Sequence, residues 1–276
     1  MTIAAALADA VQRLKAAEIP DAANDARILL AAALGIERSR LTLVLPDTFA
    51  KDQKTIFEAT ISARLLRQPV SQIVGQRAFY GRAFSVTPDV LDPRPDTETL
   101  ITTALLHPFE TLLDLGTGSG CIVLTLLCEN KKSKGVAGDL SAAALEVARG
   151  NAASLGLLER CEFIQSDWFT QITGQFDLIV SNPPYITETE MAALAPEVRD
   201  WEPLIALTPG GDGLAAYRVI TAAAMGHLNV GGRLIVEIGP HQGDDVQALF
   251  RGAGFDGITC FQDIDGRDRV VMGRQP

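Results

Sequence analysis

The sequence holds few cysteines and histidines, and none of them is spaced in a metal-binding or disulfide pattern. Its three histidines lie far apart, and its four cysteines form no CxxC pair: Cys121, Cys128, Cys161 and Cys260. Structural zinc sites and disulfide frameworks need closely spaced ligands or paired cysteines. We therefore expect no metal site, and we expect reduced cysteines that fill the core of a cytoplasmic protein.

Long apolar runs and an excess of positive charge are also missing. No run approaches the ~18 residues of a membrane span, and no basic segment precedes an apolar one at the N-terminus. We therefore expect neither a membrane span nor a signal peptide. Lys and Arg total 24 against 34 Asp and Glu, for a net charge of −10. Because phosphate contacts dominate nucleic-acid affinity, this acidic balance argues against stable nucleic-acid binding.

Residues 1–70 have the pattern of a small helical bundle. Apolar residues recur at helical spacing, with few β signals, in three helices that we expect over residues 2–17, 21–34 and 52–67. One interpretation is a purely structural appendage. We favour a docking domain for a macromolecular substrate, because the domain that follows would not need such an appendage for a small substrate.

Residues 71–92 are expected to link the two domains. Aromatic and β-branched residues surround Gly75 and Gly81, which predicts a β-hairpin. This hairpin would lead directly into the larger domain.

The larger domain is expected over residues 93–276 and opens with the segment Pro93–Glu98. Its two prolines hold the chain extended. We expect Asp96 or Thr97 to cap a helix that runs to about residue 106.

Strand-like and helical runs alternate through the rest of this domain. Such alternation with buried-looking strands is typical of an α/β fold with a doubly wound, mostly parallel, seven-stranded Rossmann-like sheet. The gap between the last two strands is too short for a crossover helix, so we expect an antiparallel hairpin at the sheet edge. The expected strands cover residues 111–115, 135–139, 161–165, 176–181, 233–238, 258–261 and 269–272.

A glycine-rich turn follows the first of these strands. Gly116, Thr117, Gly118, Ser119 and Gly120 stand between the strand and an apolar helix. Ligands of doubly wound sheets bind at the carboxyl ends of strands, where glycines let backbone N–H groups and a helix N-terminus approach closely. Such turns also serve nicotinamide and flavin enzymes, or only the fold, so this turn alone leaves the ligand open.

Two further groups follow the next two strands. Asp139 can accept hydrogen bonds from both hydroxyls of a ribose, or it can cap the next helix, a role that Ser141 could fill instead. Asp167 and Trp168 suit an adenine, through a hydrogen bond to its amino group and ring stacking, although Trp168 could also simply pack. Three such elements in this order predict an adenosine-containing cofactor.

The tetrapeptide after the fourth strand indicates the chemistry. It consists of Asn182, Pro183, Pro184 and Tyr185. The prolines stop strand pairing and hold the backbone rigid. The Asn182 side-chain oxygen and the Pro183 carbonyl are two acceptors that can hold both hydrogens of one NH2 group, and the Tyr185 ring can cover a flat amide or base.

Two fixed acceptors meet a specific chemical need. The lone pair of an amide or exocyclic amino nitrogen is delocalised, and acceptors placed where positive charge develops stabilise the transition state. We therefore predict methyl transfer from S-adenosylmethionine to such a nitrogen, with Asn182, Pro183 and Tyr185 as catalytic residues. We call the two acceptors and the Tyr185 ring the cradle. A nicotinamide dehydrogenase has no NH2 group to hold in such a cradle. The remaining interpretation is a strand-ending turn without chemistry.

These motifs resemble those of the release factor glutamine N5-methyltransferase family, within the class I S-adenosylmethionine-dependent methyltransferases. The resemblance covers nearly the whole chain. The Pro-Arg-Pro-Asp-Thr-Glu segment is the more specific clue, because many nucleic-acid amino-methyltransferases share only the tetrapeptide. The family-like segments are Pro69–Gly75, Pro93–Glu98, Asp114–Gly120, Asn182–Tyr185, Glu202–Leu204, Glu237–Gly239, Gln242 and Asp268–Val270.

The resemblance implies that the glycine turn, Asp139 and Trp168 contact S-adenosylmethionine. It implies that Asn182 touches both cofactor and substrate, and that the rest of the tetrapeptide lines a glutamine pocket. The substrate would be the glutamine of the Gly-Gly-Gln motif in peptide chain release factors. The N-terminal helical domain would help to dock that factor.

Two other hypotheses remain open at this point. An N-methyltransferase for an exocyclic amino group of adenine or guanine in RNA or DNA would use the same cradle on a flipped-out or single-stranded base. The acidic balance of the chain argues against it. A non-catalytic cofactor-binding or scaffold protein is the third hypothesis, and an intact cradle beside an intact glycine turn argues against that.

Overall fold

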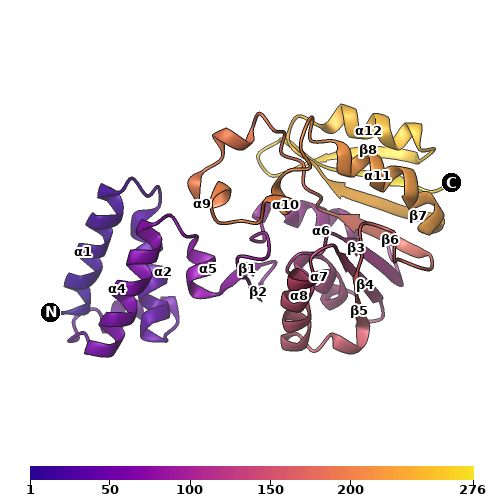
Figure 1. Cartoon of the computed structure of the whole chain (residues 1–276). Helices are drawn as coiled ribbons and strands as arrows, with labels where there is room; N and C mark the ends of the chain where they lie inside the picture. The colour runs from indigo at the N-terminus through magenta and orange to yellow at the C-terminus, as the bar shows by residue number, and fades with distance from the viewer. The chain divides into compact units, whose positions relative to one another are not determined.

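The computed structural model describes residues 1–276, which divide into two compact units (Figure 1). The helical unit consists of Met1–Gln76 together with Ala195–Trp201. The sheet unit consists of Arg77–Leu194 and Glu202–Pro276. No helix in the chain has the length and apolar character that a membrane crossing requires. The helical unit thus contains one segment that lies far later in the sequence than the rest of it.

The helical unit is a small bundle, as the sequence predicts. A hydrogen bond from Ala5 N to Thr2 Oγ1, at 3.2 Å, caps its first helix. Leu14 and Phe57 are fully buried in its core. Its helices are α1 (Ile3–Ala16), α2 (Ala22–Leu34), α3 (Leu41–Val44), α4 (Lys51–Leu65), α5 (Val70–Val74) and α9 (Pro196–Arg199).

The segment between the domains differs in part from the predicted hairpin. Its first residues form α5 instead of a strand, because Val70, Ile73 and Val74 pack against the helical core at the i, i+3, i+4 spacing of a helix face. Gly75, with φ of +76°, ends this helix in a left-handed conformation. The hairpin follows as β1 (Gln76–Phe79) and β2 (Arg82–Ser85).

The sheet unit contains the predicted seven-stranded sheet. Its strands are β3 (Thr111–Leu115), β4 (Lys134–Asp139), β5 (Cys161–Gln165), β6 (Phe176–Ser181), β7 (Leu228–Glu237), β8 (Asp256–Gln262) and β9 (Asp268–Arg274). Their order is β5-β4-β3-β6-β7-β9-β8, and the strands are parallel except that β9 pairs antiparallel with both β7 and β8. The predicted antiparallel hairpin is therefore confirmed. Its second strand inserts between β7 and β8, so β8 forms the edge.

Helices cover both faces of this sheet (Figure 1). In β3, Leu112 belongs to one hydrophobic core whereas Leu113 and Leu115 belong to the other, because successive strand residues point to opposite faces. The first core includes α6 (Glu98–Ala104), α7 (Cys121–Glu129) and α8 (Ala142–Ser154), and the second includes α11 (Ala215–Ala224) and α12 (Gly243–Gly252). The short helix α10 (Leu204–Leu207) precedes α11.

The strand order reverses between β3 and β6, at the centre of the sheet. In open α/β sheets, ligands bind at the carboxyl ends of the strands beside such a reversal. The glycine turn follows β3, Asp139 ends β4, and Asn182 follows β6. The parallel pairing of these three strands therefore brings the residues selected from the sequence to one edge of the sheet.

Candidate active site

A buried carboxyl group supports the glycine turn after β3. Asp114 has no exposed surface, and its Oδ2 accepts hydrogen bonds from Thr117 Oγ1 at 2.7 Å and Val123 N at 3.3 Å. Burial raises the pKa of Asp114 to about 7. Gly116 and Gly118 have φ of +69° and +54°, and a Cβ on either would meet nothing within 4 Å. The turn therefore presents bare backbone to open space.

Asp139 faces the same turn from the end of β4. Its Oδ2 accepts a hydrogen bond from Gly118 N at 2.8 Å, and its Oδ1 accepts one from Ser141 N at 2.9 Å. Ser141 caps α8 through a bond from Ala144 N at 3.2 Å, so Asp139 is not the helix cap. Burial raises the pKa of Asp139, and the backbone hydrogen bonds oppose that rise.

A cavity of about 340 Å³ lies where these segments of the sheet unit meet. Small-molecule sites typically span roughly 300–1,000 Å³. The half-buried Trp168 has φ of +50°, a strained conformation for a bulky residue, and such strain often marks a functional site. Nine predicted site residues line the cavity: Gly116, Thr117, Gly118, Ser119, Asp139, Asp167, Trp168, Asn182 and Pro184.

Three predicted site residues are not among those that line the cavity: Gly120, Pro183 and Tyr185. A Cβ on Gly120 would stand 3.0 Å from Leu124 Cδ1, so this glycine allows close packing at the start of α7. Pro183 is buried, and Tyr185 is half-buried. Burial raises the pKa of Tyr185, so its hydroxyl stays protonated at neutral pH. The structure thus separates a cofactor-sized cavity from the rest of the tetrapeptide.

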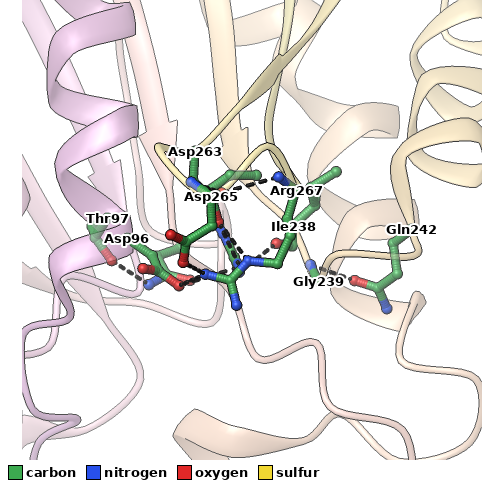
Figure 2. A network of polar contacts seen from close by, with 10 residues as sticks. Asp96, Thr97, Ile238, Gly239, Gln242, Asp263, Asp265 and Arg267 are labelled. Carbon is green, nitrogen blue, oxygen red and sulfur yellow. Dashed lines mark hydrogen bonds and ion pairs between the residues drawn. The ribbon is translucent and has the colours of Figure 1, made fainter.

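A glutamine side chain holds the backbone of the tetrapeptide in place. Gln242 Nε2 donates to Tyr185 O at 3.0 Å. Figure 2 shows its Oε1, which accepts from Gly239 N at 3.0 Å. The Tyr217 hydroxyl donates to Glu237 O at 2.9 Å and lies 3.4 Å from this Oε1. Gly213 approaches so closely that a Cβ there would stand 2.4 Å from Tyr185 O. The loop is therefore fixed from two sides.

A cluster of charged side chains surrounds the end of β7. Glu237 is 1% exposed, and burial raises its pKa to about 7, while a hydrogen bond from Thr97 and the charge of Arg269 oppose that rise. Arg269 Nη2 lies 3.2 Å from Asp96 Oδ2 and 3.3 Å from Asp263 Oδ2. Figure 2 shows Asp96, Asp263 and Thr97 gathered in this network.

Thr97, Glu237 and Gln242 have contacts in the site that sequence reasoning did not assign to them. Asn182 Nδ2 donates to Thr97 Oγ1 at 3.4 Å. The predicted capping role of Thr97 is wrong, because its side chain forms no capping bond at the start of α6. All three residues stand in family-like segments. That was the available signal, but their spacing gives no hint of what they contact.

Two protein-family descriptions match the chain: PrmC N-terminal domain over residues 5–75 and Methyltransferase small domain over residues 90–198. A release factor glutamine methyltransferase of Cereibacter sphaeroides is 56% identical, covering 100% of this chain and 99% of that protein. Another, of Agrobacterium fabrum, is 42% identical and covers 99% and 98%. A solved methyltransferase structure from Pyrococcus furiosus has a similar fold, with a TM-score of 0.55, 16% identity, and coverage of 82% of this chain and 99% of that chain.

Proposed function

This chain belongs to the release factor glutamine methyltransferase family, and from that membership we propose that it transfers a methyl group from S-adenosylmethionine to a protein. The acceptor is the side-chain amide nitrogen, N5, of the glutamine in the Gly-Gly-Gln motif of a peptide chain release factor. The factor is a protein partner met in the cytoplasm. One observation carries the proposal: Asn182 lines the same cavity as the glycine turn and Asp139.

The cavity suits S-adenosylmethionine in its volume of about 340 Å³ and in the groups that line it. Bare backbone at Gly116 and Gly118 leaves room for a ligand where side chains would otherwise stand. The Asp139 carboxylate has acceptor capacity left for ribose hydroxyls, and Asp167 and Trp168 offer an acceptor and a ring to an adenine. When bound, this cofactor supplies a methyl group that its sulfonium already activates.

The residues of the tetrapeptide hold and polarise the amide. Asn182 Oδ1 and the Pro183 carbonyl accept its two hydrogens, which moves electron density onto the nitrogen and stabilises the charge that develops there. The two prolines keep these acceptors in place. The Tyr185 ring covers the flat face of the amide, and its hydroxyl stays protonated because burial raises its pKa.

The helical unit is proposed to dock the release factor. Its match to the PrmC N-terminal domain supports this role. A protein substrate needs a docking surface outside the cavity, whose volume of about 340 Å³ is that of a small-molecule site.

A methyl-transfer assay tests the proposed function. The purified protein is mixed with methyl-labelled S-adenosylmethionine and one of three acceptors: unmodified release factor, the same factor with its Gly-Gly-Gln glutamine replaced, or ribosomal RNA. We expect label on the unmodified factor alone. Asn182→Ala should lower kcat about 100-fold or more, because it removes an acceptor that acts in the transition state.

Asn229→Ala is the matched control for this substitution. Asn229 is also half-buried, but it bonds Asp177 Oδ1 at 2.7 Å near the opposite end of the sheet, so its loss should leave kcat unchanged. Label on RNA with the factor blank would overturn the proposal in favour of base methylation. Label on the factor that lacks the glutamine would place the methyl group on another residue.

A further inference from the structure

One polar side chain is buried in α8 of the sheet unit. Asn151 is 2% exposed, whereas the other buried residues of that helix are apolar: Ala144, Leu145, Ala148 and Ala152. A buried amide destabilises a fold unless it is hydrogen-bonded. Asn151 meets this need with three hydrogen bonds, all of them to backbone atoms outside its own helix. It therefore ties α8 to other segments of the unit.

Two of these bonds go to Ser85, the last residue of β2. Ser85 N donates to Asn151 Oδ1 at 2.7 Å, and Asn151 Nδ2 donates to Ser85 O at 3.1 Å. The side-chain amide thus bonds both backbone groups of one strand residue, as a residue of a neighbouring antiparallel strand would. Figure 1 shows β2 next to α8, and the two elements are in contact. The end of β2 is therefore fixed to α8.

The chain that follows Ser85 forms one wall of the cavity. Val86 and Val90 are buried in a small hydrophobic cluster with Ala144 of α8. Residues 89–92 line the cavity, as Ala144 does. Because only three residues separate Ser85 from this wall, a bond that fixes Ser85 to α8 also fixes where the wall begins.

The third bond of Asn151 reaches the glycine turn, which forms another wall of the cavity. Asn151 Nδ2 donates to Ser119 O at 2.9 Å. Because a peptide bond is planar, holding this carbonyl also sets the direction of the Gly120 N–H, which donates to Thr117 O at 2.8 Å. The turn lies so close to α8 that a Cβ on Gly120 would stand 3.2 Å from Ala148 Cβ. The glycine turn is therefore fixed to the same helix as residues 89–92.

We propose that Asn151 is a positioning residue for the cofactor, whose single amide holds two walls of the cavity in place, the glycine turn and residues 89–92. It acts through the backbone of Ser119 and Ser85, and it is not among the residues that line the cavity. The inference rests on the proposed function, which places S-adenosylmethionine between these walls. Loss of the amide should therefore weaken cofactor binding and spare methyl transfer from the cofactor once it is bound.

Two substitutions remove the donors of Asn151. Asn151→Asp keeps the shape of the side chain but places a carboxylate oxygen beside the carbonyls of Ser85 and Ser119, and Asn151→Leu removes all three bonds at similar volume. We expect the Kd for S-adenosylhomocysteine, measured by calorimetry, to rise about 10-fold or more in both, because a buried carbonyl loses its donor. With release factor as acceptor, the KM for S-adenosylmethionine should rise similarly, while kcat stays within about 3-fold of the parent.

A purely structural role for Asn151 would give a different result. Fewer molecules would then be folded, which lowers the number of binding sites and the apparent kcat but leaves the Kd of the folded molecules unchanged. Calorimetry reports the number of sites and the Kd separately, and each titration is run well below the Tm of the variant. A reduced number of sites with an unchanged Kd would overturn the proposal.

Asn130→Leu is the matched control in the sheet unit. Asn130 is half-buried and donates from Nδ2 to Phe109 O at 2.8 Å, and neither residue lines the cavity. This variant also loses a bond from an asparagine amide to a backbone carbonyl, but at a distance from the cofactor. We expect its Kd for S-adenosylhomocysteine to change less than about 2-fold. A rise equal to that of Asn151→Leu would assign the effect to general loosening of the unit and overturn the positioning role.

The positioning role and the proposed function can fail separately. If the parent protein binds S-adenosylhomocysteine but leaves release factor unlabelled, the proposed acceptor is wrong, and the Kd values still decide the role of Asn151. If the parent labels the factor and both Asn151 variants bind S-adenosylhomocysteine as tightly as the parent does, only the positioning role is wrong. A parent protein that binds no S-adenosylhomocysteine would overturn both.

Discussion

A buried charged cluster of the helical unit and two buried carboxyl groups of the sheet unit differ in how they are paired. In the helical unit, Arg64 is 6% exposed and lies 2.8 Å from Asp25 Oδ2 and 3.0 Å from Glu197 Oε1. In the sheet unit, Asp114 and Glu237 are at most 1% exposed, and each keeps one carboxyl oxygen without a hydrogen-bond partner. The charges around Arg64 are therefore paired with one another, whereas Asp114 and Glu237 are only partly satisfied.

The pKa values of these carboxyl groups differ in the same sense. Burial opposes ionisation of Glu197, but its hydrogen bonds and the charge of Arg64 outweigh burial and hold its pKa below the usual range. Burial raises the pKa of both Asp114 and Glu237 to about 7. Paired charges hold a segment in place, whereas incompletely paired ones cost stability and are kept where a site needs them.

The largest expected effect comes from breaking the paired cluster. Arg64→Met leaves Asp25 and Glu197 without their buried partner, and should lower the free energy of unfolding of the helical unit by up to about 5 kcal/mol. The chain has two tryptophans, and Trp201 lies in the helical unit while Trp168 lies in the sheet unit. Urea unfolding followed by Trp201 fluorescence in a Trp168→Phe background measures the change. A loss below about 1 kcal/mol would contradict the interpretation that Arg64 stabilises the unit through buried ion pairs.

The pH dependence of stability should have opposite signs in the two units. Asp114 has a folded-state pKa of about 7, above its ordinary value of 3.8, so its contribution is full below pH 3.8 and is lost as pH rises through 7. Asp114→Asn should therefore gain stability relative to the parent, by about 4 kcal/mol, between pH 4 and pH 8. Fluorescence of Trp168 in a Trp201→Phe background follows this unit.

Glu197→Gln is the counterpart in the helical unit. Because the folded-state pKa of Glu197 is lowered, its contribution is present above the ordinary value of 4.5 and is lost as pH falls below it. The penalty of Glu197→Gln should therefore shrink toward acid, opposite in direction to Asp114→Asn. Parallel pH slopes in the two variants would remove the distinction between the units.

Two glycines extend the comparison to the backbone. Gly213→Ala places a Cβ 2.4 Å from Tyr185 O, so the tetrapeptide must move. We expect about 2 kcal/mol of lost stability and about a 10-fold lower kcat. Gly35→Ala in the helical unit is the control: its φ is +66°, but nothing lies within 4 Å of the added Cβ. It should cost about 1 kcal/mol and leave kcat unchanged. Equal kcat losses in the two variants would contradict a specific role for the Gly213 contact.

The smallest effect is expected at an exposed ion pair. Arg13 Nη1 lies 2.7 Å from Glu58 Oε2, with side chains 34% and 39% exposed. Arg13→Met should lower the free energy of unfolding of the helical unit by no more than about 1 kcal/mol, and less at 1 M salt. The Trp201 assay gives this value next to that of Arg64→Met. A loss as large as that of Arg64→Met would show that burial is not what distinguishes the two pairs.

Much of the sheet unit could be predicted because its signals are local. The strands at residues 111–115, 161–165 and 176–181 have the predicted bounds, since buried runs between turn residues leave little choice. At Val70–Val74 a short apolar run predicted a strand where the structure has helix α5. Such a run fits a strand or a helix face equally well. Packing against the helical core decided for the helix.

The doubly wound sheet, the glycine turn and the tetrapeptide at one sheet edge could all be predicted from the sequence, because each depends on a pattern a few residues long. The surroundings of Asn182 could not, because they depend on residues that the fold brings together from distant segments. Thr97 lies 85 positions before it, and Gln242 lies 57 positions after Tyr185. Such contacts follow from strand order and helix placement, so residue spacing carries no record of them. The type of reaction can therefore be predicted from a short motif, whereas the residues that hold that motif in place can be identified only from the folded structure.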